Sequence, residues 1–240
     1  MTLVVTTYVP EGIVMASDSR QSITISNKDN DGKDLNIEII NSDSVTKIFL
    51  LEKQSMGIST FGQDFHTGIP MASYIRQFSE EIVNDTDDVE TVARELVNFI
   101  IKDFGKINCG FHVCGYKKEE KMISPYVFHC YIGDGKVIRT NIDDNGSIIY
   151  GTIWGGQTDV LESLLIPIYG SNKEILRNAF PIKWRAMALQ EAIDFSIFAI
   201  NTTINIMKFQ ARFKSVGGAI DILIITPHEG KFIQKKKLSI

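Results

Sequence analysis

The spacing of apolar residues divides the chain into segments of strand-like and helix-like character. Up to about residue 61, short runs rich in β-branched residues are separated by turn residues, which is typical of strands. Strands are predicted at 3–8, 13–17, 23–26, 36–40, 45–51 and 56–61. In 66–84 and 89–104 the apolar residues recur at helical spacing, so each segment is predicted to form an amphipathic helix.

The second half of the chain repeats this change from strands to helices. Strands are predicted at 110–116, 126–132, 137–140, 147–150, 219–226 and 232–234, and helices at 158–168 and 184–210. Asp87 and Glu90 form a capping pattern before the helix at 89–104. Asp144-Asn145-Gly146 predicts a hairpin turn between the strands on either side of it.

The order of these elements indicates a fold class. Strands, two helices, strands, two helices and strands follow one another, which favours an α+β fold over regular βαβ alternation. Two helix pairs covering two sheets would give a four-layer sandwich. No internal repeat and no linker interrupts the pattern, so we expect residues 1–240 to form a single domain.

The first predicted turn sets the register of the hairpin at the chain start. Pro10 suits a type I turn, and Gly12 suits the left-handed residue of a three-residue hairpin with a bulge. In this favoured register Thr2, Asp18 and Arg20 share one face at the open end of the hairpin. The alternative is a two-residue turn, which shifts the register by one and moves Asp18 to the face opposite Thr2.

Composition and charge exclude several classes of protein. The chain is 44% apolar and 22% charged, the balance of an ordinary globular protein. Its net charge of −4 argues against a nucleic-acid surface. The first apolar run is too short for a signal peptide, and no stretch has the length of a membrane span. We therefore expect a cytoplasmic protein that makes no membrane contact and whose three cysteines are reduced.

Two clusters are compared with known metal sites. In the acidic loop 27–38, the calcium-ligand spacing of an EF-hand is matched by Asn27, Asp29, Asp31, Gly32 and Glu38. The flanking segments read as strands rather than helices, so a solvated hairpin loop is favoured over calcium binding. A zinc site is the alternative for Cys109, His112, Cys114, His129 and Cys130. Strand alternation points these side chains in different directions, so buried strand residues are favoured and no metal or cofactor is expected.

Four segments, in order along nearly the whole chain, resemble the proteasome β-subunit family. They are Thr2 with 12–20, then 46–49, 111–133 and 216–230. The stretch Met15-Ala16-Ser17-Asp18-Ser19-Arg20 is most similar to the Anbu-type bacterial members. The resemblance implies an αββα sandwich of the N-terminal-nucleophile hydrolase type, in agreement with the predicted element order.

The resemblance also implies a chemistry. Once Met1 is removed, the hydroxyl of Thr2 would attack an amide carbonyl and its own α-amine would take the proton. A free α-amine has a pKa of about 7.7–8.0, so a useful share is neutral at cytoplasmic pH. Thr2 is small enough for methionine aminopeptidases to accept the preceding bond. Lys47 matches the family's active-site lysine, and Asp18 matches the acid that holds it.

Two further residues are expected to support this site. Arg20 is assigned an ion-pair role, and the oxyanion donor is expected to be a backbone N–H between Thr60 and Gly62. Thr60 stands where the family usually has glycine. Other departures are Gln157, in place of a Gly-Ser-Gly turn, and Phe213 and Val216, in place of an Asp and a Ser. The hydrogen bonds that those family residues make to the N-terminus are therefore absent or rebuilt.

The resulting prediction is a threonine-type amidohydrolase that cuts peptides or unfolded protein. The family resemblance implies a homo-oligomeric ring or ring-like assembly and allows an ATP-dependent unfoldase as partner. Two alternatives stay open. One is a catalytically inactive ring or scaffold subunit of the same fold, and the other is an amidase for a small non-peptide amide.

Overall fold

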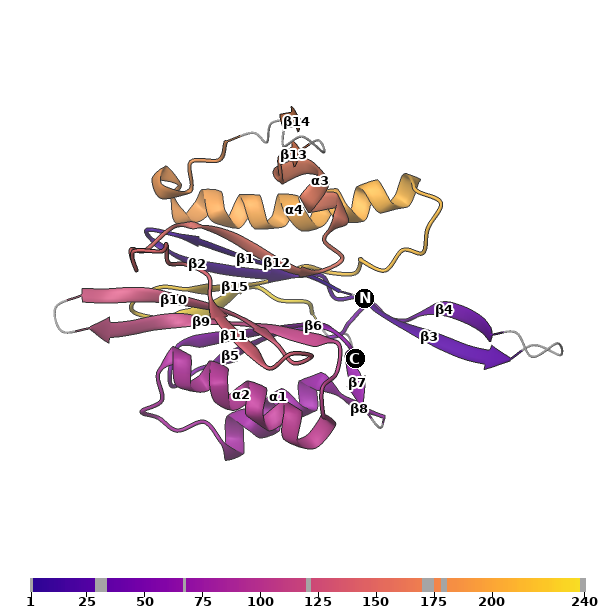
Figure 1. Cartoon of the computed structure of the whole chain (residues 1–240), viewed down its shortest axis with the longest axis horizontal. Helices are drawn as coiled ribbons and strands as arrows, with labels where there is room; N and C mark the ends of the chain where they lie inside the picture. Colours follow the sequence, from indigo (N-terminus) through magenta and orange to yellow (C-terminus); the bar gives the residue numbers. More distant parts are fainter. Residues whose placement is uncertain are drawn as a thin grey trace.

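The structure is a computed structural model that describes residues 2–28, 34–66, 68–119, 122–169, 175–177 and 181–237. Its main strands and helices form four layers, with two sheets in the middle and helices on both outer faces (Figure 1). The predicted α+β, αββα sandwich is confirmed.

The first sheet contains the first and last strands of the chain. Its order is β12 (Gly151–Gly156), β1 (Leu3–Val9), β2 (Gly12–Ser17), β15 (Asp221–Ile225) and β16 (Gly230–Gln234). Helices α3 (Asp159–Leu165) and α4 (Leu189–Phe209) cover its outer face. Leu3 and Val5 of β1 pack there against Leu161 of α3 and Ile200 of α4. This packing fixes the strand that carries the chain start.

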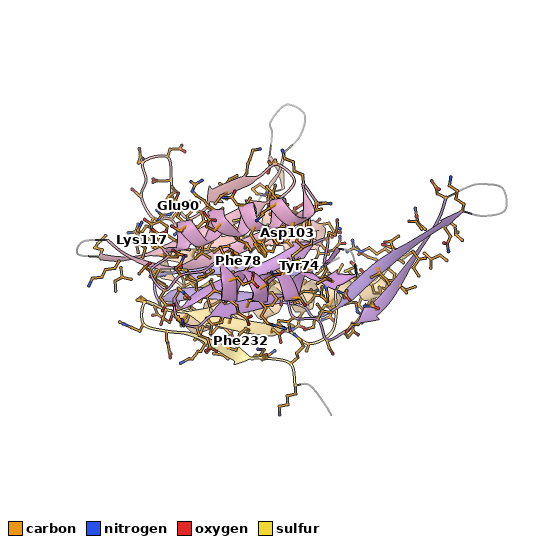
Figure 2. The ribbon with its side chains drawn as sticks, turned by 90° about the horizontal axis from the view of Figure 1, so that it is seen from below. Tyr74, Phe78, Glu90, Asp103, Lys117 and Phe232 are labelled. Carbon is orange, nitrogen blue, oxygen red and sulfur yellow. The ribbon has the colours of Figure 1, made fainter. Side chains whose placement is uncertain are left out.

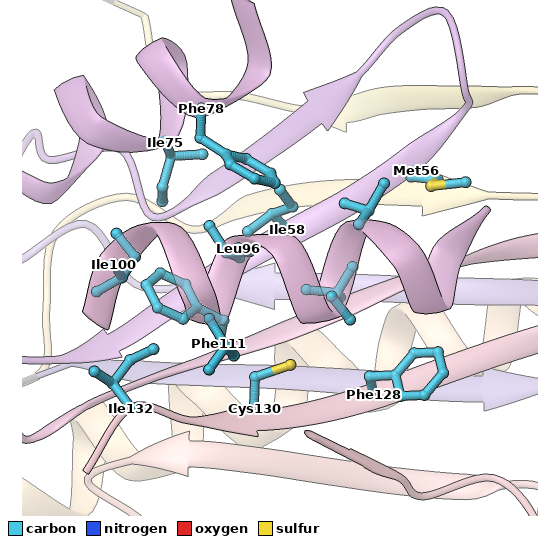
Figure 3. Packing of buried hydrophobic residues seen from close by; sticks show 14 of the residues in the cluster. Met56, Ile58, Ile75, Phe78, Leu96, Ile100, Phe111, Phe128, Cys130 and Ile132 are labelled. Carbon is cyan, nitrogen blue, oxygen red and sulfur yellow. The ribbon is translucent and has the colours of Figure 1, made fainter. Parts of the chain in front are cut away.

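The second sheet lies under the other helix pair. Its order is β11 (Lys136–Arg139), β10 (Met122–Tyr131), β9 (Cys109–Glu119), β6 (Met56–Gly62) and β5 (Ile48–Leu51). Helices α1 (Met71–Glu81) and α2 (Val89–Phe104) cover it. Figure 3 shows Leu96 and Ile100 of α2 and Phe78 of α1 directed onto Phe111 and Ile58 of the sheet. The helical spacing seen in the sequence is thus the spacing of core contacts.

The two sheets meet in a third apolar cluster that contains Met15, Ile48, Cys114 and Leu223. The approach is close at Gly57, where a Cβ atom would lie 2.3 Å from the sulfur of Met15. A side chain at this position would therefore displace the packed ends of Met15, Leu223 and Ile225.

The register of the first hairpin differs from the favoured prediction. Val9 pairs with Gly12 and Val4 with Ser17, so the turn has two residues and the bulged register is wrong. Gly12 does not serve as a left-handed turn residue. A Cβ atom there would lie 2.9 Å from the side chain of Leu189 and 3.1 Å from the carbonyl oxygen of Ile225. Close packing, not turn geometry, is the reason for the glycine.

Two other local predictions are corrected. Asp144-Asn145-Gly146 does form a turn, but 137–140 and 147–150 are not its hairpin strands. Lys136–Arg139 pairs with β10 instead, and a single bridge joins Ile142 to Ile148 beside the turn. The helix cap lies one residue later than predicted, because the side chain of Asp88 accepts the N–H of Thr91.

Helix α2 begins where predicted, whereas α1 and α4 each begin about one turn later. Helix α1 starts after Pro70, whose missing N–H and fixed φ suit a helix start, and the preceding β7 (Phe65–His66) and β8 (Ile69–Pro70) pair with each other. A 3-10 turn at Trp184–Ala186 precedes α4. Strands β13 (Ile168–Tyr169) and β14 (Ile175–Arg177) form another small pair. None of the helices in the described ranges has the length and apolar character that a membrane span requires.

One pair of strands leaves the sandwich. Strands β3 (Gln21–Lys28) and β4 (Asp34–Ser42) form a separate two-stranded ribbon that extends away from the body of the molecule (Figure 1). We call this ribbon the arm. It agrees with the strands predicted at 23–26 and 36–40. Asp29, Asp31 and Gly32 of the calcium hypothesis lie outside the described residues.

Candidate active site

The carboxylate of Asp18 is the centre of the candidate site. Strand β2 ends at Ser17, and the next residue turns its side chain back toward the chain start. Oδ1 accepts the N–H of Leu3 at 2.9 Å and the ammonium of Lys47 at 2.7 Å. Oδ2 accepts the N–H of Gly217 at 3.0 Å and the N–H of Arg20 at 3.2 Å. Four donors therefore meet on one carboxylate, three of them from other segments of the chain.

Lys47 and Asp18 form a buried ion pair. Their side chains are 1% and 0% exposed, and Lys47 Nζ also donates to the carbonyl oxygen of Arg20 at 2.5 Å. Removing two charges from water is costly, and the cost is recovered only when further hydrogen bonds satisfy both groups. The pair therefore holds the ammonium in a fixed position rather than serving as a simple source of stability.

Thr2 lies beside this pair. The N–H of Leu3 belongs to the Thr2–Leu3 peptide and shares Asp18 Oδ1 with the lysine. The carbonyl oxygen of Thr2 accepts the N–H of Gln157 at 2.7 Å. In the chain that begins with Met1, Thr2 is 3% exposed. The structure thus brings Asp18 and Lys47 to the peptide that follows Thr2; these are the three residues to which the family resemblance assigns catalysis.

The route by which Asp18 reaches Thr2 is not the predicted one. Strand alternation in the observed register does not place the two side chains on one face. Proximity arises because the backbone N–H of Asp18 still donates to the Leu3 carbonyl at 3.2 Å while its carboxylate folds back onto the Leu3 N–H. Asp18 is therefore positioned by the backbone turn at the end of β2 and not by the alternation of side chains along the strand.

Gly156 permits the chain start to lie against β12. Its φ is +97°, and a Cβ atom there would lie 1.8 Å from the carbonyl oxygen of Thr2. No side chain fits at that distance. The glycine at this position is therefore needed for the Thr2–Gln157 hydrogen bond.

Arg20 belongs to an ion pair at the margin of the site. Its Nε and Nη2 donate to the two oxygens of Asp43 at 2.6 and 2.7 Å, and Nη1 donates to the carbonyl of Lys214. The hydrogen bond from Arg20 lowers the pKa of the Asp43 carboxyl. A Cβ atom on Gly217 would lie 2.6 Å from the Arg20 Cζ, so the guanidinium packs against the loop that donates to Asp18. Its contacts are those of a residue that supports the site from outside.

Thr60 does not offer its amide to a substrate. Its N–H already donates to the carbonyl of Lys47 at 3.0 Å, and its hydroxyl lies 3.8 Å from the sulfur of Cys109. Amide directions alternate along a strand, and Gln63 N–H donates in the other direction, to Asn108. By this alternation the N–H of Gly62 is expected on the same side as that of Thr60, beyond Ile48, the first residue of β5.

Sequence reasoning missed two polar groups next to the site. The hydroxyl of buried Ser215 donates to the side-chain oxygen of Gln157 at 3.3 Å, and the N–H of Gln157 donates to Thr2. Both residues therefore support Thr2, in a chain where the family's Asp and Ser are replaced by Phe213 and Val216. Gln21 donates to Asp64 at 2.5 Å and accepts from Asn41 at 2.6 Å. Ser215 lies one residue before Val216, which stands where the family has a serine, so this shift by one residue is a signal in the sequence. Asp64 and Asn41 belong to no recognisable motif.

Asp64 is a largely buried carboxyl close to the charged pair. Burial raises its pKa, and the hydrogen bond from Gln21 and the charge of Lys47 offset part of this effect. The carboxyl therefore keeps its proton to a higher pH than an exposed aspartate does.

The cysteine and histidine cluster is divided between layers, as strand alternation predicted. Cys109 and Cys130 pack under α2, whereas Cys114 lies between the sheets. Burial raises the pKa of Cys109 to about 12. His112 donates to or accepts from Thr6 at 2.9 Å. Within the described ranges, no three His, Cys, Asp or Glu side chains are grouped so that they could hold a metal ion.

The two helix-covered sheets form the αββα sandwich that the family resemblance implied, with Thr2 directly before the inner strand β1. Among solved structures, the chain is similar to an Anbu protein from Hyphomicrobium sp. strain MC1, solved as a mutant, and to Anbu, described as an ancestral beta-subunit, from Yersinia bercovieri. The first is 17% identical and the second 14%, both with a TM-score of 0.58. The alignments cover 98% of this chain and 87% and 88% of those chains.

The other comparisons found no relative. No protein-family model matches the chain, and no curated protein matches it. At identities of 17% and 14%, the likeness to the Anbu structures is a likeness of fold, so the chemistry of this chain must be argued from its own residues.

Proposed function

We propose that this chain is a threonine-type N-terminal-nucleophile amidohydrolase that cuts peptide bonds through Thr2 once Met1 is removed. The observation that carries the proposal is the sharing of Asp18 Oδ1 by the Leu3 N–H and the Lys47 ammonium. This arrangement keeps a cation next to the first peptide of the mature chain. A nearby cation favours the deprotonated forms of an amine and a hydroxyl.

The proposed reaction starts with proton transfer inside one residue. The hydroxyl oxygen of Thr2 attacks the carbonyl carbon of the substrate while the free α-amine of Thr2 accepts the hydroxyl proton. The N–H of Gly62 would donate to the oxyanion that forms. Collapse of this intermediate breaks the C–N bond, and the leaving amine takes the proton from the α-ammonium. An ester to Thr2 remains.

Water completes the cycle. The α-amine takes a proton from water as the water attacks the ester, and the threonine hydroxyl leaves with that proton. Lys47 neither gains nor loses a proton in these steps; its charge stabilises the developing negative charge. Gln157 and Ser215 would hold the backbone of Thr2 in place.

The assembly and partners are part of the same proposal. A homo-oligomeric, ring-like assembly would enclose the site and restrict it to peptides or unfolded protein. An ATP-dependent unfoldase could then supply the substrate. Support comes from the fold shared with a protein described as an ancestral beta-subunit.

A specific observation favours a second candidate, a non-catalytic subunit of the same fold. Thr2 is 3% exposed in the chain that begins with Met1, so a substrate cannot reach it in that form. The two candidates differ in whether Met1 is removed.

Intact mass spectrometry of the untagged protein tests the proposal, before and after treatment with a peptide epoxyketone or β-lactone. We expect loss of Met1 and one adduct that is absent in Thr2→Ala. Thr24→Ala, which removes an exposed threonine on the arm, should keep the adduct. Retained Met1 with no adduct would support the non-catalytic subunit instead.

A further inference from the structure

The arm has one apolar and one polar face. Ile23 pairs with Ile39, Ile25 with Ile37 and Asn27 with Leu35, and paired side chains in an antiparallel ribbon share a face. We define the apolar face of the arm as Ile23, Ile25, Leu35, Ile37 and Ile39. The pairs between them, Thr24 with Glu38, Ser26 with Asn36 and Lys28 with Asp34, form the polar face, on which Ile40, paired with Ser22 at the base of the arm, is the apolar exception.

The apolar face is exposed in the single chain. Leu35 is 49% exposed and Ile37 is 44% exposed, and Figures 1 and 2 both show the arm pointing away from the sandwich. An isolated two-stranded ribbon is marginal in water, and a contiguous exposed apolar surface of this kind marks an interaction site. Regular alternation over both strands is the pattern of a surface that is half buried. Something therefore covers this face in the working protein.

The same chain offers a receiving surface. A hollow of about 540 Å³ lies along β5, between α1 and the end of β16. Its apolar lining comes from Ile48, Phe49, Leu50, Ile75 and Phe232. Figure 2 shows Phe232 on the last strand, on the side of the molecule where α1 lies. Among the described strands, β5 pairs with β6 alone, so the hollow follows an open sheet edge.

Charges match between the two surfaces. The described arm carries Asp34 and Glu38 against Lys28, all on its polar face, and the hollow carries Arg76 and Lys235 against Glu52, so the excess charge is negative on the arm and positive at the hollow. Surfaces of opposite net charge attract each other and disfavour wrong partners.

We propose that the apolar face of the arm docks into the β5–α1 hollow of a second copy of this chain. The arm points away from its own body, so one copy cannot fill its own hollow. Each copy would give an arm to one neighbour and receive one from another. Such a head-to-tail contact makes a ring if the rotation closes and a helix if it does not. The proposal supplies a contact for the assembly proposed above, but it does not depend on the chemistry of Thr2.

Sedimentation velocity of the full-length protein and two pairs of variants test this contact. Ile37→Lys on the apolar face and Ala72→Arg in the hollow should each convert assemblies into monomers. Thr24→Lys on the polar face and Gln77→Arg on the exposed side of α1 should assemble as wild type. Thr2→Ala should also assemble as wild type, which separates failure of this contact from failure of the proposed catalysis. Circular dichroism checks that each variant folds.

Cross-linking identifies the partner surface. The native cysteines are free and buried, so introduced ones report alone. A mixture of Ile37→Cys and Ala72→Cys chains should give a disulfide-linked heterodimer, and neither chain should cross-link by itself. Self-cross-linking of Ile37→Cys chains would show arm-to-arm pairing and overturn the proposal. Wild-type protein that stays monomeric, or Ile37→Lys that assembles normally, would overturn it as well.

Discussion

Lys47 Nζ lies 2.7 Å from Oδ1 of Asp18, and that oxygen also accepts the N–H that follows Thr2. The position of the cation and the position of the chain start are therefore fixed by the same atom. A change to either partner should affect both the stability of the fold and the chemistry proposed for Thr2.

Lys47→Met tests this link. The variant leaves the buried Asp18 carboxylate without its cation, and breaking a buried pair on one side costs about 3–5 kcal/mol of unfolding free energy. Urea denaturation measures the loss. The double variant Lys47→Met with Asp18→Asn should lose less unfolding free energy than the two single variants together, because it leaves no buried charge without a partner. Additive losses would mean that the two groups do not interact as described. Probe labelling of Thr2 should be lost in each variant.

Gly156→Ala should unfold or strongly destabilise the protein and prevent labelling of Thr2. The added methyl group would lie 1.8 Å from the Thr2 carbonyl oxygen, in a backbone conformation that already disfavours side chains. Gly146→Ala is the matched control, because Gly146 also has a positive φ of 78° but open space around it. The control should lose about 1–2 kcal/mol, the backbone cost alone. Equal losses in the two variants would contradict the close approach.

Asp64→Asn should stabilise the protein at neutral pH. Burial raises the pKa of this carboxyl in the folded state, so the folded protein binds the proton more tightly than the unfolded chain does. Stability then falls as the pH rises from the ordinary carboxyl pKa of about 3.9 through the raised value. The variant removes this loss and can still accept the hydrogen bond of Gln21. Urea midpoints measured from pH 3 to pH 8 should converge at the acid end.

Asp134→Asn is the control for that series. Asp134 is fully exposed, and its hydrogen bond with Lys136 lowers the pKa of its carboxyl, the opposite direction. Its replacement should not stabilise the protein at neutral pH. A gain of the same size in both variants would point to net charge rather than to burial of Asp64.

Asp88→Ala should weaken the start of α2. Partial burial works to raise the pKa of Asp88, but hydrogen bonds from Lys117 and Thr91 outweigh it and bring the pKa to about 2. The ionised Asp88 carboxylate therefore stabilises the folded state at pH values above the ordinary carboxyl pKa of about 3.9. This stabilisation is lost as the pH falls toward 2. Loss of an N-cap typically costs about 1 kcal/mol. Asp85→Ala, which breaks only an exposed ion pair with Lys53, should cost less.

Residue patterns predict those parts of the fold that depend on periodic burial. Helix α2 lies at the predicted 89–104 because its apolar stripe is also its core contact. The hairpin register was predicted wrongly because Gly12 was assigned to the turn, whereas its neighbours Leu189 and Ile225 come from distant elements. Such packing has no local signature. The predicted hairpin around Asp144-Asn145-Gly146 failed for the same reason, since tertiary pairing with β10 takes 136–139 away from it.

The candidate site was predictable to the extent that it matches a family motif. Thr2, Asp18 and Lys47 were assigned from that resemblance and lie together in the structure. Gln21 and Asp64 could not be found this way, because single polar residues brought together by the fold carry no spacing signal.

Asp18 takes its donors from both ends of the chain, and this has a consequence for synthesis. Leu3, Asp18 and Lys47 leave the ribosome early, but Gly217 emerges only when nine-tenths of the protein has been made. Until then Oδ2 of Asp18 lacks one of its partners, and β15, the neighbour of β2, is missing. A nascent or truncated chain has the threonine without its completed surroundings. Under the proposed function, an unfinished chain would therefore lack a completed site around Thr2 until its last tenth has been made.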